Sequence, residues 1–120
     1  MNLKILRQIF KACADDTRLR ILSLLDTREF NVGEICFLLK IPQPTVSKHL
    51  TNLRLLKIVI DRRQGNLVYY GLNKDISSAQ GKTVNFIISQ FHNINIFKKD
   101  KQTIKSEKIK FKTKTIKRRC

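Results

Sequence analysis

The amino-acid sequence predicts a mainly α-helical fold with one β-hairpin (α+β), and three features of the pattern lead to it. Apolar residues recur at helical spacing in four successive stretches, at residues 3–13, 17–25, 32–39 and 44–56. After Lys57 the pattern changes to two short stretches of β-branched and aromatic residues separated by a polar turn. A further helical stripe then follows. With 120 residues, the chain is expected to form one domain with a modest core.

The first two predicted helices differ in how their apolar residues are distributed. Residues 3–13 have a wide apolar face, which either belongs to the core or is shared with a second subunit. Asp15 and Asp16 then supply an N-cap and a favourable charge for the next helix. That helix, residues 17–25, is apolar nearly all round and is expected at the centre, before a linker at residues 26–30.

Two further helices are predicted close together in the sequence. Asn31 and Glu34 have the spacing of a capping box, which starts a helix at residues 32–39. After a turn at residues 40–42, a second helix starts near Pro44, because proline fits the first helical turn. Two short helices joined by about four residues have the spacing of a helix-turn-helix.

The second of these helices has an apolar back and a polar front. Its apolar stripe consists of Val46, Leu50, Leu53 and Leu56. Small polar and basic side chains on the opposite face can reach base edges in a DNA major groove while the back stays packed. The predicted DNA contacts are Gln43 at the helix entrance and then Thr45, Ser47, Lys48, His49 and Asn52. An ordinary amphipathic surface helix has the same periodicity, and His49 fits either a phosphate contact or a hydrogen bond to the local backbone.

A β-hairpin directly after a recognition helix is a wing, so the predicted architecture is a winged helix-turn-helix. The strands are expected at residues 58–60 and 67–70, joined by a polar turn at residues 61–66. Arg62 and Arg63 in the turn are expected to contact phosphate. The alternative is that they are solvated residues of a hairpin tip.

The C-terminal part of the sequence is predicted to divide at residue 97. The apolar stripe in residues 82–97 indicates an amphipathic helix, which either pairs with its symmetry mate and the first helix in a dimer or caps its own domain. Residues 98–120 hold 11 basic and 2 acidic side chains and are expected to be disordered. We therefore predict a folded domain at residues 1–97 and a basic tail at 98–120. The tail is either a nonspecific DNA-binding arm or an extension without a role.

The charge balance favours a polyanionic partner. Lysine and arginine total 25 against 9 acidic residues, a net charge of +16, which indicates nucleic acid first and an anionic membrane or acidic protein second. No apolar run approaches the roughly 20 residues of a membrane span, and the N-terminus lacks the apolar segment of a signal peptide. We expect a cytoplasmic, nucleoid-associated protein. The sequence has no phosphate-cradling glycine loop, nucleophile with a base, or metal-ligand cluster, so an enzyme is not expected.

Four runs of residues resemble the ArsR/SmtB family of winged-helix repressors. Phe10 to Leu22 is similar to that family's signature Lys-Ala-Leu-Ala-Asp-Pro-Thr-Arg-Leu-Arg-Ile-Leu, and Gln43 to Leu50 is similar to its recognition helix. Leu53 to Val59 and Gly65 to Tyr70 resemble the end of that helix and the wing. The resemblance extends over roughly residues 6–72 in unbroken order.

The resemblance implies a homodimeric repressor that dimerises through its first and last helices. Two recognition helices would enter successive major grooves of a pseudo-palindromic operator. A ligand or thiol-reactive signal would release the DNA, and by linkage it must bind the DNA-free state better. A different reading of the basic composition is a nonspecific nucleic-acid-binding protein, architectural or RNA-associated, which acts mainly through its tail.

The sequence departs from the family at the sensor. Arsenic-sensing members have Cys-Val-Cys-x-x-Cys at the start of the third helix, whereas this chain has Asn31-Val-Gly-Glu-Ile-Cys36. Trivalent arsenic binds several thiolates, so one cysteine is a poor site by itself, and Cys36 is kept as a candidate contact for arsenite or another thiophilic effector. No cofactor is required. Cys13 is either a partner for Cys36 or simply buried, and Cys120 ends the tail. Zinc-sensing members place several ligands on the last helix, where this chain has only His92.

Overall fold

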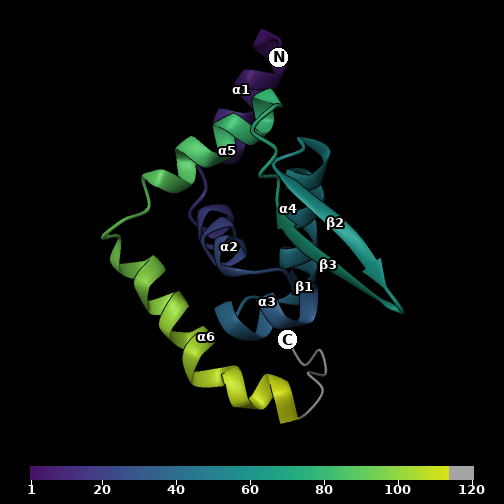
Figure 1. Cartoon of the computed structure of the whole chain (residues 1–120), viewed down its shortest axis with the longest axis vertical. Helices are drawn as coiled ribbons and strands as arrows, with labels where there is room; N and C mark the ends of the chain where they lie inside the picture. Colours follow the sequence, from purple (N-terminus) through teal and green to yellow (C-terminus); the bar gives the residue numbers. More distant parts are fainter. Residues whose placement is uncertain (114–120) are drawn as a thin grey trace.

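The computed structural model describes the backbone of residues 1–113 and the side chains of residues 1–107 (Figure 1). In chain order its elements are α1 (Leu3–Ala12), α2 (Asp16–Thr27), β1 (Phe30–Asn31), α3 (Val32–Leu39), α4 (Gln43–Leu55), β2 (Val59–Gln64), β3 (Leu67–Leu72), α5 (Ala79–Ser89) and α6 (Asn95–Thr113). In Figure 1, α2 occupies the middle of the molecule, and α5 and α6 form an arc along its left side. The hairpin of β2 and β3 extends to the right. The predicted mainly α fold with a β-hairpin wing is confirmed.

Helix starts follow the capping signals in the sequence. The Asp15 side chain caps α2 by accepting a hydrogen bond of 3.0 Å from the backbone N–H of Arg18. Asn31 and Glu34 form the predicted capping box at α3, with reciprocal bonds of 2.9 and 3.0 Å. α4 starts at Gln43 with Pro44 in its first turn, so the predicted start is confirmed to within one residue.

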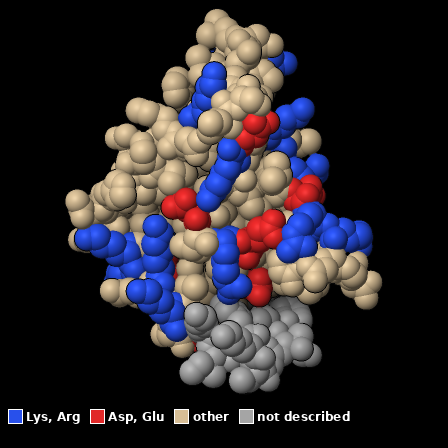
Figure 2. All heavy atoms as spheres, in the orientation of Figure 1, with Lys and Arg blue, Asp and Glu red and all other residues tan. Residues whose placement is uncertain are grey.

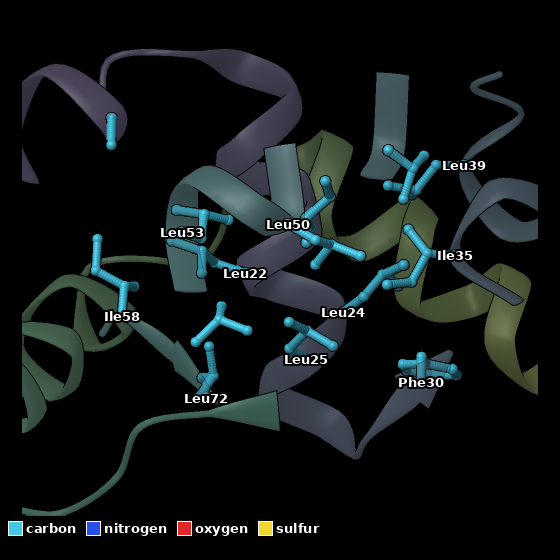
Figure 3. Close-up of a cluster of buried hydrophobic side chains, with 14 of the residues drawn as sticks. Leu22, Leu24, Leu25, Phe30, Ile35, Leu39, Leu50, Leu53, Ile58 and Leu72 are labelled. Atoms are coloured by element: carbon cyan, nitrogen blue, oxygen red, sulfur yellow. The ribbon is translucent and has the colours of Figure 1, made fainter. Parts of the chain in front are cut away.

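The core forms where α2, α3 and α4 meet (Figure 3). Leu22, Leu24 and Leu25 of α2 lie in one cluster with Leu50 and Leu53 of α4, and all five are buried. Burying a leucine or valine side chain contributes about 1.5–3 kcal/mol. The predicted central place of α2 and the predicted apolar back of α4 are both confirmed, and Leu56, at the end of the stripe, is half-buried.

The sheet has three antiparallel strands in the order β1-β3-β2. The sequence places a linker at residues 26–30 and misses β1, because a two-residue strand has no periodicity to detect. It also places a turn at residues 61–66, whereas residues 61–64 continue β2 and only Gly65 and Asn66 join the strands. Gly65 has a φ of +63°, which glycine adopts without steric cost.

The C-terminal region differs from the sequence prediction in two ways. The single helix expected at residues 82–97 is two helices, because α5 ends at Ser89 and α6 begins at Asn95. The disorder expected from Lys98 onward is not found through residue 113, where α6 continues. The remaining residues of the predicted tail, 114–120, lie outside the described part of the chain.

An apolar and acidic stripe explains why α6 is ordered. Phe97, Asp100 and Ile104 lie on one side of the helix, which packs on α2 and α3. Nε and Nη2 of Arg20 each donate a hydrogen bond of 2.9 Å to a different carboxylate oxygen of Asp100. Only 5% of Asp100 is exposed, and the ring of Phe97 packs against that of Phe91 at an angle of 42°, with the ring centroids 4.5 Å apart. The prediction of disorder was wrong for this helix because it rested on the high lysine content of the segment and not on the spacing of its apolar residues.

We predict that Asp100→Ala loosens α6, because it leaves the half-buried Arg20 without its bidentate partner. Hydrogen bonds to charged groups contribute about 1.5–3 kcal/mol, so the free energy of unfolding should fall by about that amount. Urea denaturation at constant m-value measures it. The control is Lys99→Ala, which changes an exposed neighbour on the same helix. Equal midpoints for the two variants would contradict the proposed anchor.

Candidate nucleic-acid interface

Charged side chains are unevenly distributed over the molecular surface (Figure 2). Lysine and arginine gather along the lower left, where α6 runs, and on the right, where the wing extends. Aspartate and glutamate lie mostly between these two regions, and on this face the upper end of the molecule shows mostly uncharged atoms with a few basic side chains. Basic regions of this kind attract the phosphate backbone of nucleic acids.

α4 combines a buried back with an accessible polar front. Val46, Leu50 and Leu53 are fully buried. Four of the six α4 residues predicted to contact DNA are exposed, namely Gln43, Thr45, Lys48 and Asn52. The other two, Ser47 and His49, are half-buried. A helix anchored by its back in this way holds its front side chains in a fixed orientation.

His49 makes a contact that the sequence did not indicate. Its Nδ1 accepts a hydrogen bond of 3.1 Å from Nε of Arg18 on α2, so neither sequence-based alternative describes this bond. Nη1 of the same Arg18 donates to the carbonyl oxygen of Ala12 at 3.2 Å. Partial burial lowers the pKa of His49, and the positive charges of Arg18 and Lys48 lower it further, against an opposing effect of Asp15.

The two wing arginines have different surroundings. Nε of Arg62 donates to Oε1 of Glu29 at 2.6 Å, its Nη1 donates to Oε1 of Gln64 at 2.8 Å, and its guanidinium lies 5.1 Å from the ring centroid of Tyr69. Arg63 is exposed and donates one hydrogen bond of 3.3 Å, to the carbonyl oxygen of Gly65. The guanidinium of Arg62 is therefore held by its own chain much more firmly than that of Arg63.

Arg18 and Glu29 are the two residues of this surface that sequence reasoning missed. Arg18 belongs to the Thr-Arg-Leu-Arg run that resembles the family signature. The resemblance marks this residue as a candidate but does not indicate which group it contacts. Glu29 lies in a segment predicted to be a linker and carried no signal. Each forms a hydrogen bond with a residue more than 30 positions away in the sequence, and the periodicity of apolar residues cannot predict contacts at that separation.

Cysteines and other metal-binding side chains do not gather in the part of the chain that the structure describes. Cys36 is fully buried in α3, and its sulfur is in a disulfide. Cys13 is a free, half-buried thiol whose pKa is raised by burial, so Cys13 is not paired with Cys36 within the chain. Among the described residues, no group of three His, Cys, Asp or Glu side chains could hold a metal ion, and no helix is long and apolar enough to cross a membrane.

Large apolar side chains are exposed on α1 and α5, which lie at the upper end of the molecule (Figure 1). Leu3 and Phe10 of α1 are 74% and 64% exposed, and Phe86 of α5 is 67% exposed. Large exposed apolar side chains from two elements indicate a protein–protein contact more strongly than scattered single residues do.

Comparison with known proteins identifies relatives of this chain. The family model described as "Bacterial regulatory protein, arsR family" matches residues 15–61. The chain is 35% identical over 71 residues to the transcriptional repressor SdpR of Bacillus subtilis (strain 168), covering 59% of this chain and 79% of SdpR. It is 40% identical over 78 residues to the arsenical resistance operon repressor of Escherichia coli (strain K12), covering 64% of this chain and 67% of that protein.

A solved structure with the same architecture covers most of the chain. It is the homodimeric winged helix-turn-helix DNA-binding domain, fragment 1–100, of Mb0332 from Mycobacterium bovis. The superposition has a TM-score of 0.62 at 25% sequence identity, and it covers 91% of this chain and 85% of that one.

We predict that His49 makes folding stability depend on pH. Its pKa in the folded chain lies below the ordinary value for histidine, because partial burial disfavours the charged imidazole. As the pH falls through that value, the unfolded chain takes up a proton that the folded chain does not, so the free energy of unfolding decreases until the lower folded pKa is reached. Urea unfolding between about pH 7.5 and pH 5.5 measures this effect of a histidine near pKa 6.5.

Two variants separate His49 from other titrating groups. His49→Asn should have a smaller decrease in unfolding free energy over this range than the parent protein. His92→Asn, at an exposed position, should behave like the parent. If His49→Asn shows the parent's full pH dependence, the neutral state of His49 does not contribute to stability.

Proposed function

Because this chain belongs to the ArsR family of winged helix-turn-helix transcriptional regulators, we propose that it is a homodimeric repressor that binds operator DNA through α4 and the wing. The observation that carries the proposal is the division of α4 into a back buried in the core and a polar front. The chain is a DNA-binding regulator, and its relatives include repressors. Its place of action would be the nucleoid, in the cytoplasm.

Base reading is assigned to the front of α4. Thr45, Lys48 and Asn52 are exposed there at intervals of three and four residues. Lysine donates to guanine, asparagine pairs with adenine, and threonine can contact either a base edge or a thymine methyl group. Gln43 lies at the start of the helix, where recognition helices approach the bases, and Ser47 flanks the exposed row.

The wing is assigned to the phosphate backbone, with different roles for its two arginines. Arg63 is exposed and weakly held, so its guanidinium is available for a phosphate. Arg62 is held by Glu29, Gln64 and Tyr69, and it orients the wing against the body of the protein. Removal of a phosphate contact should reduce the salt dependence of binding by about one counterion.

A two-fold dimer through α1 and α5 would present two α4 helices to one face of DNA. The exposed Leu3, Phe10 and Phe86 supply the apolar surface that such a contact needs. In helix-turn-helix dimers the recognition helices bind half-sites about 34–36 Å apart, one turn of DNA, which requires a pseudo-palindromic operator. The Mb0332 domain, which has the same fold, is homodimeric, and this supports a dimer.

A ligand or a thiol-reactive signal would release the repressor from DNA. One relative is an arsenical resistance operon repressor. Here Asn31 and Glu34 cap α3, and Cys36 is buried and disulfide-bonded, so arsenite or another thiophilic effector at Cys36 would require reduction of that bond and local opening of α3. The basic C-terminal segment, of which α6 is the described part, would add nonspecific phosphate contacts. A protein that acts mainly through such contacts is not favoured, because the family and the relatives are transcriptional regulators.

We predict that Thr45→Ala combined with Lys48→Ala removes sequence preference. Each lost base contact costs about 1–3 kcal/mol of discrimination, so the affinity for operator DNA should fall towards that for shuffled DNA. Fluorescence anisotropy with the DNA upstream of the protein's own gene measures both affinities. Lys99→Ala on α6 also removes a lysine, and it should weaken binding to both DNAs equally. If the double variant keeps the parent's preference, α4 does not read the bases.

We predict that Phe86→Glu dissociates the dimer, because a carboxylate replaces an exposed aromatic side chain on the proposed contact surface. Sedimentation equilibrium should show a monomer where the parent is a dimer, with the unfolding transition retained. The control is Ile96→Glu on α6, which places the same charge at an exposed apolar position outside the proposed contact. A Phe86→Glu dimer as tight as the parent's would move the subunit contact elsewhere.

A further inference from the structure

The hydrogen bond between Arg18 and His49 determines which nitrogen of the imidazole carries a proton. A guanidinium can only donate, so Nδ1 of His49, which accepts at 3.1 Å from Nε of Arg18, must be unprotonated. A neutral imidazole with a bare Nδ1 has its hydrogen on Nε2. The bond therefore selects the Nε2–H tautomer, and it excludes the imidazolium form for as long as it is made.

Arg18 is itself held in place from two sides. Its Nη1 donates to the carbonyl oxygen of Ala12, the last residue of α1, at 3.2 Å. Its backbone N–H donates to the Asp15 carboxylate that caps α2. The guanidinium thus links the end of α1 and the start of α2 to the recognition helix, and His49 meets a donor whose position is already fixed.

The charged groups around His49 favour the neutral ring. Arg18 and Asp15 face it from α2, Lys48 lies next to it on α4, and the half-buried thiol of Cys13 is close to Arg18 at the end of α1. Protonation would lose the bond from Arg18 and place a third cation beside Arg18 and Lys48. Asp15 offsets part of this cost, but its carboxylate already accepts the capping hydrogen bond.

Nε2 of His49 is the remaining hydrogen-bonding atom of the ring, on the edge away from Nδ1. Within the described residues, no group accepts a hydrogen bond from it. His49 is half-buried and flanks the exposed Lys48 and Asn52 of the α4 front. An N–H donor at this position suits a phosphate oxygen of the bound DNA.

We propose that Arg18 is a positioning residue for DNA binding: it holds His49 as the neutral Nε2–H tautomer and thereby presents an N–H donor to a DNA phosphate beside the base-reading face of α4. The inference rests on the proposed function, because it assumes that the front of α4 meets DNA. It adds a residue of α2, outside the helix-turn-helix, to the DNA-binding apparatus, and it assigns each nitrogen of His49 a separate task.

Three substitutions separate these tasks. Arg18→Met keeps an unbranched apolar side chain and removes the donors. His49→Asn keeps an acceptor near the position of Nδ1 and removes the outer donor, whereas His49→Gln keeps a donor near the position of Nε2 and removes the inner acceptor. Anisotropy with DNA from upstream of the gene and with shuffled DNA gives the affinities, and ¹⁵N NMR of the full-length parent and of Arg18→Met gives the tautomer.

The parent should show His49 with its proton on Nε2, and Arg18→Met should show a mixture of tautomers. Loss of a net hydrogen-bond contribution of about 0.5–1.5 kcal/mol corresponds to about a 2- to 12-fold weaker affinity for Arg18→Met. His49→Gln should bind DNA more tightly than His49→Asn. In the combination of Arg18→Met with His49→Asn, the two effects should not add, because both act through one donor.

A proton on Nδ1 in the parent, or unchanged affinity of a folded Arg18→Met, would overturn the proposal. If Arg18→Met does not fold, the tautomer of the parent and the order of the two His49 variants still decide it, and His49→Asn binding as tightly as the parent would count against it. If the parent shows no preference for any tested DNA while the tautomer is as expected, the proposed function fails and the Arg18–His49 contact stands.

Discussion

The burial of one side of α4 in the core, where α4 packs on α3 and β2, is the interaction on which the rest of the structure depends. Val46, Leu50 and Leu53 have no exposed surface, so α4 cannot rotate or slide without opening the core. Protein interiors are packed closely enough that such a face fixes the helix in one orientation. The polar front is therefore preorganised, and the wing that follows α4 leaves the body in a defined direction. The DNA-binding surface is a consequence of how the core is packed.

Local signals in the sequence predicted most of this fold. The Asn31–Glu34 capping box, the Asp15 cap and the stripe on α4 concern residues at most a few turns apart, and all three are as expected. The errors fall where tertiary contacts override composition. The lysine content of α6 predicts disorder. However, the bidentate pair of Arg20 and Asp100 joins residues 80 positions apart and holds α6 on α2.

The candidate site was predictable to the level of its elements but not of its contacts. The helix period identified which α4 residues are outside, and the hairpin signal identified the wing. These local patterns could not reveal that Arg18 would contact His49 or that Glu29 would contact Arg62, because each pair is brought together only by the packing of separate elements. By contrast, the contact between Asn31 and Glu34 was predictable, because the two residues are three positions apart and cap one helix. The ordered α6 also means that cutting the chain at residue 97 would remove part of the folded structure.

The most direct test of the account is the affinity of the full-length chain for the DNA upstream of its own gene, compared with shuffled DNA of equal length and composition, at two salt concentrations. We expect a preference for the upstream DNA of about 10³-fold or more that persists when salt weakens both affinities. Equal affinities at both salt concentrations, also for other upstream regions of the genome, would contradict sequence-specific repression. The protein would then be a basic protein that binds DNA without reading its sequence through α4.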